Sequence, residues 1–459
     1  MLGRQKRKQT VTSGFTLIEG LVVLFIASVV IVTFLNVFSQ GSAWLLESEK
    51  KTTAVAIANE KMEMLRNLAY ANVGVSGGIP DGVVAGEEFL TKAGTQYRIV
   101  TDIRYIDDPY DGTFGGSPND TLNVDQKRAT VRVLWGDEDE TQRASLSAIF
   151  VPPGIESLSG AGTISINVID SSGAGVPAAS VHVVHPGEGI DFSTTTDSTG
   201  NVLLPGAPES IDQEYEITVS KSGYETVATY PPYPTTAFDP VDEHAAVLEG
   251  GLTNKVITSD PLADVDIRTV DSQGDAIADA LLTISGGRIL GENPDTEEDI
   301  YNYNQDIAAD GSGEYDMDDV SPGSYDVVLR GATDTGYVLA YVSPGDDLVA
   351  NRFPVDGGAS PAIDVVLMDN AVPGLLVNVL NNDDDSPIAG ADVRLENAVL
   401  GYDETVPTNA YGVALFPNTS TDLVNDTYTL SVTATGFGDE SDSVVVNNLT
   451  EKEIKMTPS

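Results

Sequence analysis

One carboxylate stands inside an apolar run near the start of this chain. Glu19 is the only charged residue in the stretch from Phe15 to Phe38. A carboxylate inside a membrane costs roughly 2.5 to 3.5 kcal/mol on insertion scales, and such residues usually pair with a specific group. We therefore expect Glu19 to have a defined partner.

The residues before this run carry an unusual targeting signal. Residues 1–14 hold four basic side chains and no acid, so they are expected to stay on the cytoplasmic side of the membrane. A secretory signal has its small-residue cleavage site after the apolar segment, whereas Gly14 precedes it here. Cleavage after Gly14 would remove the basic leader and retain the hydrophobic helix.

The junction Gly14-Phe15-Thr16-Leu17-Ile18-Glu19 resembles the type III signal of bacterial type IV pilins and of type II secretion pseudopilins. In those families a prepilin peptidase cuts after the Gly, and the new N-terminal Phe is N-methylated. The resemblance implies cleavage between Gly14 and Phe15, methylation of Phe15 and an assembly role for Glu19. We expect Glu19 to pair with the α-amino group of Phe15 on a neighbouring subunit. The alternative is an uncleaved signal anchor in which Glu19 reaches the membrane interface.

A long helix is predicted over residues 15–71. Its first part, 15–38, spans about 36 Å at 1.5 Å per residue and is long enough to cross a membrane. From Val55 to Ala69, apolar residues recur every three or four positions, which indicates an amphipathic helix that packs on one side. Gly and Pro residues then end the helical pattern.

Alternating runs at 97–103, 129–135 and 144–150 predict half-buried antiparallel strands. One long helix followed by a small sheet is what the pilin resemblance implies, and the strands that end at Trp135 and Phe150 resemble those of a minor pilin or a minor pseudopilin. We place this α+β pilin part at residues 72–155. The acidic loop from Asp107 to Asp120 is interpreted as solvated, with calcium binding as the alternative.

The remaining residues repeat a pattern three times. Each repeat has a strand, a polar turn and a second strand. The first strands are predicted at 164–169, 265–270 and 375–380. The second strands are predicted at 176–181, 276–281 and 387–393. A turn made of an acid or amide, two residues and Gly follows at Asp197, Asp310 and Asn409. The next strands carry Tyr215, Tyr325 and Tyr428, and a Gly-aromatic pair closes each repeat 23, 23 and 24 residues after the turn glycine.

Short alternating strands with regular turns predict small antiparallel sandwiches. The repeats resemble carboxypeptidase regulatory-like and Cna B-type domains, which implies three all-β prealbumin-like sandwich domains that serve as spacers or binding modules. We place them at residues 156–252, 253–370 and 371–459. Some Cna B-type domains carry an isopeptide crosslink from a Lys in the first strand, but no first strand here contains Lys, so none is expected.

The second repeat is longer than the other two, and its surplus lies near residues 291–306. This segment holds six acids together with Tyr301 and Tyr303. Tyr301 and Tyr303 are candidates for a calcium-dependent or carbohydrate-binding loop, and the alternative is an extended hairpin with solvated charge. The segment Tyr230-Pro231-Pro232-Tyr233-Pro234 is interpreted as a stiff crossover, with peptide recognition as its alternative.

Little in the chain indicates catalysis. His182, His185 and His244 are the only histidines, and we interpret His182 and His185 as exposed strand residues because no metal-ligand spacing surrounds them. No phosphate-binding loop or nucleophile elbow is present, and Cys is absent. We expect no enzyme activity, cofactor or metal. The net charge of −46 disfavours nucleic acid and anionic lipid as partners.

Together these features predict a minor type IV pilin that displays three sandwiches for adhesion or surface contact. Its expected partners are the prepilin peptidase, other pilin subunits, the pilus assembly machinery, the membrane and a surface or carbohydrate ligand. The precursor would cross the cytoplasmic membrane once with its N-terminus inside, and the assembled subunit would lie at the cell surface. The alternatives are a type II secretion pseudopilin that recruits cargo and an anchored surface protein that never polymerises.

Overall fold

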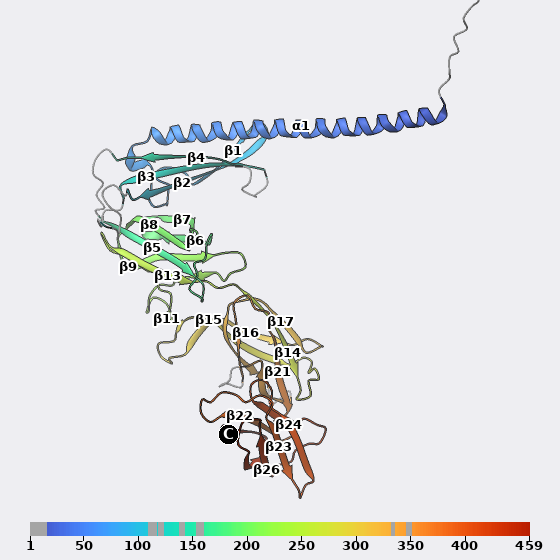
Figure 1. Cartoon of the computed structure of the whole chain (residues 1–459). Helices are drawn as coiled ribbons and strands as arrows, with labels where there is room; N and C mark the ends of the chain where they lie inside the picture. The colour runs from blue at the N-terminus through green and yellow to red at the C-terminus, as the bar shows by residue number, and fades with distance from the viewer. Residues whose placement is uncertain are drawn as a thin grey trace, which may run out of the picture. The chain divides into compact units, whose positions relative to one another are not determined.

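The computed structural model describes residues 16–108, 117, 124–136, 143–152, 160–331, 336–345 and 351–459 (Figure 1). The chain divides into two compact units, Met1–Ser157 and Leu158–Ser459. Gly14 and Phe15 lie outside the described residues, as does most of the acidic loop between residues 107 and 120.

The first unit begins with one long helix, α1 (Leu17–Arg66), which is unbroken for 50 residues. It ends earlier than the predicted residue 71, because the side chain of Asn67 donates to the carbonyl of Glu63 and its backbone N–H bonds within the last turn. A single 3₁₀ turn, η1 (Tyr70–Asn72), follows.

A four-stranded antiparallel sheet packs on the second half of α1 (Figure 1). Its strands lie in the order β1 (Glu87–Lys92), β2 (Thr95–Ile106), β3 (Gln126–Trp135) and β4 (Arg143–Phe150). The three predicted strands are confirmed as β2, β3 and β4. Strand β1 was not predicted, because half of its residues are charged and nearly all are exposed, so it lacks the alternating pattern of a half-buried strand. The helix residues buried against the sheet are Ala54, Ile57, Ala58, Met62 and Leu65.

The described strands of the second unit form six sheets that follow one another along the sequence as three facing pairs. We name them sheet pair 1 (residues 160–259), sheet pair 2 (260–369) and sheet pair 3 (370–459). Sheet pair 1 contains β5 (Ala161–Ile169), β6 (Ser180–His185), β7 (Ile190–Thr195), β8 (Asn201–Pro208), β9 (Ser210–Ser220), β10 (Val227–Ala228), β12 (Ala245–Val247) and β13 (Leu252–Thr258). Its two sheets have the orders β13-β5-β8 and β10-β9-β6-β7, with β12 on β9.

The other two pairs repeat this plan. Sheet pair 2 contains β14 (Ala263–Val270), β15 (Leu281–Glu292), β16 (Asp299–Ala308), β17 (Glu314–Val320), β18 (Gly323–Leu329), β19 (Tyr337–Ser343), β20 (Arg352–Val355) and β21 (Ala362–Asp369). Sheet pair 3 contains β22 (Gly374–Asn381), β23 (Asp392–Asn397), β24 (Tyr402–Pro407), β25 (Val413–Phe416), β26 (Asp426–Thr433), β27 (Glu440–Val446) and β28 (Leu449–Met456). The first strands and the tyrosine-bearing strands of all three repeats are where the sequence predicts them.

Each pair is closed by a parallel contact, which corrects the expectation of purely antiparallel sandwiches. The first strand pairs in parallel with the last: β5 with β13, β14 with β21, and β22 with β28. A parallel neighbour needs a long crossover, here through the facing sheet, and the strand pattern alone does not reveal it. Because β13 belongs to sheet pair 1, the predicted boundary between residues 252 and 253 is wrong.

The second strands begin later than predicted. Each predicted run contains a residue in the left-handed region, namely Ala178 (φ 55°), Asp279 (φ 58°) or Gly390 (φ 70°). A residue with positive φ cannot continue a strand. The strands β6, β15 and β23 therefore start only after it.

Candidate assembly helix and module junctions

The N-terminus of α1 is capped by its own side chains. Thr16 is the N-cap residue, and its hydroxyl accepts from the backbone N–H of Glu19 at 3.3 Å and donates to the Glu19 carboxylate at 3.5 Å. Thr-x-x-Glu is the sequence of a capping box, which indicates that Thr16 is the helix cap. The predicted helix start at residue 15 overlooked this motif. Glu19 thus stabilises the helix start as well as being a candidate for assembly.

None of the residues that the structure describes covers the first half of α1. The apolar side chains from Leu17 to Phe38 are exposed, and so are Trp44, Leu45 and Leu46. Among the described residues, α1 is the one helix long and apolar enough to cross a membrane. Glu19 is exposed on this apolar surface, and its predicted pairing with Phe15 stays a prediction because Phe15 lies outside the described residues.

The repeated turns are built by side chains that accept backbone N–H groups. Asp197 Oδ1 accepts from the N–H groups of Thr199 and Asn201 at 2.8 and 2.9 Å, and Asp310 and Asn409 accept from the second and fourth residues after them in the same way. These hydrogen bonds, foremost that from the Asn201 N–H, lower the pKa of Asp197; the pKa of Asp310 is lowered first by the Glu314 N–H.

The glycine that ends each of these turns is required by its surroundings. Gly200 has φ 83°, and an added Cβ would lie 2.3 Å from the carbonyl oxygen of Val168. Gly412 has φ 71°, and its Cβ would lie 2.6 Å from the carbonyl oxygen of Val379. Only glycine fits both the conformation and the space.

The three repeated tyrosines anchor the sandwich cores. Tyr215, Tyr325 and Tyr428 are all fully buried. Each hydroxyl donates to a backbone carbonyl a few residues earlier, at Pro208, Ser321 and Val424, over 2.9, 2.6 and 3.0 Å. These bonds satisfy the polar end of each ring and tie the strand to its preceding loop.

The candidate ligand tyrosines lie on an extended hairpin. Strands β15 and β16 pair from Leu281 to Glu292, and Tyr301 lies opposite Ile289. Tyr303 is half-buried and packs edge-on against Tyr325 at 5.7 Å, and burial raises its pKa to about 12. The Tyr301 hydroxyl donates to Asp299 at 3.3 Å. Tyr303 is thus a core-packing residue, which favours the hairpin interpretation over a ligand loop.

This hairpin also joins sheet pair 1 to sheet pair 2. The proline-rich segment after Tyr230 leads to strand β11 (Asp239–Pro240), which pairs with Glu292 and Gly291 of β15. An added Cβ on Gly291 would lie 2.2 Å from the Asp239 carbonyl oxygen, so only glycine allows this approach. The surplus of the second repeat therefore serves, in part, to extend its sheet to the preceding module.

An ion-pair cluster reinforces the same junction. The Arg288 guanidinium donates to Glu225 and Asp242 of sheet pair 1, each at 2.8 Å, and to the carbonyl oxygen of Thr258 at 2.8 Å. The side chains of Arg288, Glu225 and Asp242 are 16%, 5% and 14% exposed. Charges this buried need their partners, since removal of one leaves another unpaired in a low-dielectric site.

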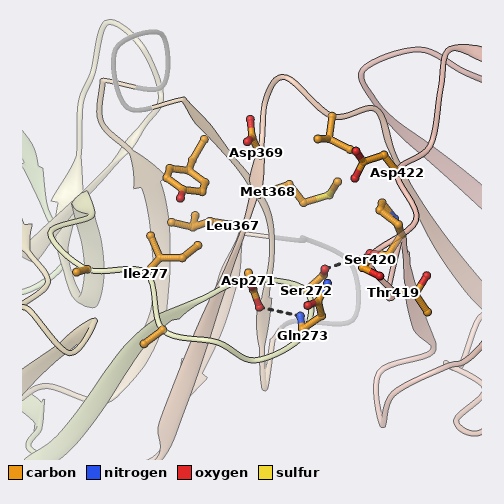
Figure 2. Close-up of a pocket in the computed structure, with 15 residues that line it drawn as sticks. Asp271, Ser272, Gln273, Ile277, Leu367, Met368, Asp369, Thr419, Ser420 and Asp422 are labelled. Carbon is orange, nitrogen blue, oxygen red and sulfur yellow. Dashed lines mark hydrogen bonds between the residues drawn. The ribbon is translucent and has the colours of Figure 1, made fainter.

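Sheet pairs 2 and 3 meet through an apolar cluster and a polar cleft. The cluster contains Ala340, Val366, Met368, Leu376 and Leu415. Ser272 of the first turn in sheet pair 2 donates to the Pro417 carbonyl at 3.1 Å. The adjoining cavity has a volume of about 450 Å³. In Figure 2, Asp271, Gln273 and Ile277 lie on one side of it and Thr419, Ser420 and Asp422 on the other.

One of the two strand histidines differs from its predicted setting. His182 is half-exposed and pairs with Asp191 at 2.8 Å. His185 is 3% exposed and packs edge-on against Tyr215, so its predicted exposure is wrong; it lies on the inward face of β6. Among the described residues no group of three or more His, Asp or Glu side chains is arranged to hold a metal ion.

Comparisons with known proteins bear on the sheet pairs. Residues 163–244 match the family of the Carboxypeptidase regulatory-like domain, as the resemblance predicts for the first repeat. A search of curated proteins finds no match. Solved structures with similarity include the Bacillus anthracis TIE protein, with 13% identity over 81% of this chain and 73% of that chain and a TM-score of 0.20.

Two further similar structures are named as pilins. The Streptococcal ancillary pilin is 10% identical over 65% of this chain and 99% of that chain, with a TM-score of 0.20. GBS52, the minor pilin of Streptococcus agalactiae, is 11% identical over 43% of this chain and 96% of that chain, with a TM-score of 0.18. TM-scores this low carry no functional argument.

Proposed function

We propose that this chain is a minor type IV pilin, a filament subunit that carries three β-sandwich domains outward. The observation that supports this most is the division of α1: its first half is apolar and exposed, and its second half packs on a four-stranded antiparallel sheet. A helix half that the described part of the chain leaves exposed needs either lipid or neighbouring helices around it.

The Gly14-Phe15 junction and Glu19 complete the proposal. Cleavage after Gly14 by a prepilin peptidase would create the Phe15 amino group, which is then methylated. In the filament that amino group would pair with Glu19 of a neighbouring subunit, so a misplaced subunit would keep an unpaired charge. The precursor would cross the cytoplasmic membrane once, with its basic leader inside.

The sandwich domains would serve display and contact, not catalysis. The polar side chains of their turns and the hydroxyls of their repeated tyrosines make hydrogen bonds within the domains. Their many acidic residues would keep a crowded cell surface soluble. A type II secretion pseudopilin has the same helix requirements, so it is the second candidate.

Replacement of Glu19 tests the assembly role. We expect Glu19→Ala to be cleaved normally but to reach sheared filaments at less than about one tenth of the wild-type level, because the Phe15 amino group of the neighbouring subunit would lose its partner. Glu49→Ala, on the exposed part of α1 beyond the apolar run, is the matched control and should assemble normally. Normal filament entry of Glu19→Ala would contradict the proposed role.

A further inference from the structure

One tripeptide pattern is confined, within the second unit, to sheet pair 3. Asn-x-Ser/Thr, with any residue except Pro at x, is the acceptor sequence for N-linked glycosylation. Of the four asparagines between residues 418 and 450, three begin such a tripeptide, namely Asn418, Asn425 and Asn448. None of the 17 described asparagines before Asn418 does so, and a further tripeptide at Asn119 lies outside the described residues. Chance placement along the chain would not concentrate the pattern in this way.

All three asparagines lie at one end of sheet pair 3. The starts of β22, β26 and β28 meet the ends of β25 and β27 there, as the registers of these strands show. The Asn448 N–H donates to Oδ1 of Asn425 at 3.3 Å. This end adjoins sheet pair 2, since Ser272 donates to the carbonyl of Pro417, the residue before Asn418. Sugars on these asparagines would therefore surround the junction between sheet pairs 2 and 3.

The three tripeptides differ in accessibility. Asn418, Thr419 and Ser420 are all exposed and belong to no helix or strand. In the other two tripeptides, Thr427 and Thr450 lie in the strands β26 and β28. A residue paired in a strand has its backbone committed to the sheet, whereas a loop can adapt to the binding site of an enzyme. In the folded chain, Asn418 is therefore the most accessible acceptor.

The side chains that glycosylation would use at Asn418 are not engaged elsewhere. Among the described residues, neither the Asn418 carboxamide nor the Ser420 hydroxyl makes a hydrogen bond. The loop is held instead through the Asn418 backbone N–H, which donates to the Glu404 carboxylate at 3.0 Å. By contrast, the Thr450 hydroxyl donates to the Asn447 carbonyl at 3.2 Å and accepts from the Asn447 N–H at 2.9 Å.

We propose that sheet pair 3 is N-glycosylated, with Asn418 as the principal acceptor. The co-substrate is a sugar joined through C1 to the phosphate of a lipid carrier, and a separate transferase catalyses the step. The Asn418 Nδ2 forms a bond to C1 of the sugar, and the bond from C1 to the phosphate oxygen breaks. The phosphate leaves with the electron pair, and the amide nitrogen loses one proton to a base of the transferase.

The sugar would lie beside the polar cleft between sheet pairs 2 and 3. Thr419 and Ser420 line the cavity of about 450 Å³ from the side of sheet pair 3. A glycan is bulky and hydrophilic, so one on Asn418 would cover this junction and limit the access of other proteins to it. The proposal goes beyond display and filament entry, and it depends on neither α1 nor the cleavage junction.

Mass spectrometry of peptides from the full-length chain, purified from its native cells, tests the proposal. We expect the Asn418 peptide to carry the added mass of a hexose or N-acetylhexosamine on that asparagine, and Asn418→Gln to abolish it. Asn447→Gln is the matched control, because Asn447 is exposed but begins no such tripeptide, and it should leave the addition unchanged. An Asn418 peptide without sugar would overturn the proposal, whatever is found at Asn425 or Asn448.

Replacement of Ser420 separates an N-linked sugar from other attachments. Ser420→Ala removes the hydroxyl that the tripeptide requires, and we expect occupancy of Asn418 to fall at least about tenfold. Ser420→Thr keeps a hydroxyl and should retain the sugar. Because Ser420 is exposed and its hydroxyl makes no hydrogen bond among the described residues, neither change should disturb folding. Undiminished sugar in Ser420→Ala would overturn the proposal, since attachment would then not follow the tripeptide.

Discussion

At the scale of single residues, the chain repeatedly uses a polar side chain to close a turn or cap a helix. Thr16 and Glu19 do so at the start of α1, and Asp197, Asp310 and Asn409 do so in the sheet pairs. Asp and Asn are interchangeable in these turns because the hydrogen bonds need only an acceptor oxygen. The carboxylate adds a dependence on pH that the amide lacks.

Asp310 makes that dependence measurable. Hydrogen bonds from the Glu314 and Ser312 N–H groups lower its pKa in the folded chain. A lowered folded pKa means that its stabilisation is fully present above the unfolded value, about 3.9, and is lost as the pH falls through the folded pKa. A carboxyl-carbon NMR titration should give Asp310 a pKa below that of the unfolded chain, whereas exposed acids without such bonds serve as the control. A pKa at or above the unfolded value would contradict the turn geometry.

At the scale of elements, the sequence predicts those features that local pattern determines. The alternation of β2, β3 and β4, the first strand of each repeat and the strands that carry the repeated tyrosines all follow from periodicity and spacing. The parallel closure by β13, the strand β11 and the packing of Tyr303 were missed, because they depend on which distant segment lies alongside. A local sequence pattern does not show which distant segments pack together.

Gly291 tests the β11 contact at this scale. We expect Gly291→Ala to displace β11, because the new Cβ would collide with the Asp239 carbonyl. The Val241 N–H, which donates to the Leu290 carbonyl at 3.0 Å, should then exchange with deuterium at least about tenfold faster. Gly311→Ala is the matched control, since an added Cβ there meets nothing within 4 Å. Unchanged exchange at Val241 in Gly291→Ala would refute the proposed role of this contact.

Arg288 tests the ionic part of the same junction. Arg288→Ala leaves Glu225 and Asp242 without their cation in a largely buried site, and we expect it to lower the free energy of unfolding by about 3 kcal/mol. Arg394→Ala removes a surface cation paired with Asp403 and Glu396 and should lower the free energy of unfolding much less, because solvent screens exposed ion pairs. Urea unfolding of the sheet pairs, followed by circular dichroism, compares the two variants. An equal loss of unfolding free energy in the two variants would show that burial of the Arg288 cluster does not add to stability.

At the scale of the whole molecule, the chain combines two units with opposite surface requirements. The first exposes an apolar half-helix that needs lipid or neighbouring helices, and the second is a series of acidic sheet pairs suited to water. Of the candidate site, Glu19 and the cleavage junction are predictions from a short sequence motif, and they stay predictions. It does not reveal the module junctions, which depend on tertiary packing.

The proposed function is tested most directly by where the chain goes after cleavage. A C-terminal tag would be followed through cell fractionation and filament shearing, in strains with and without the prepilin peptidase. We predict that the peptidase shortens the chain and that the tag appears in sheared filaments only when the peptidase is present. A shortened chain that stays in the membrane fraction, or a chain that is never shortened, would contradict the assignment as a filament subunit.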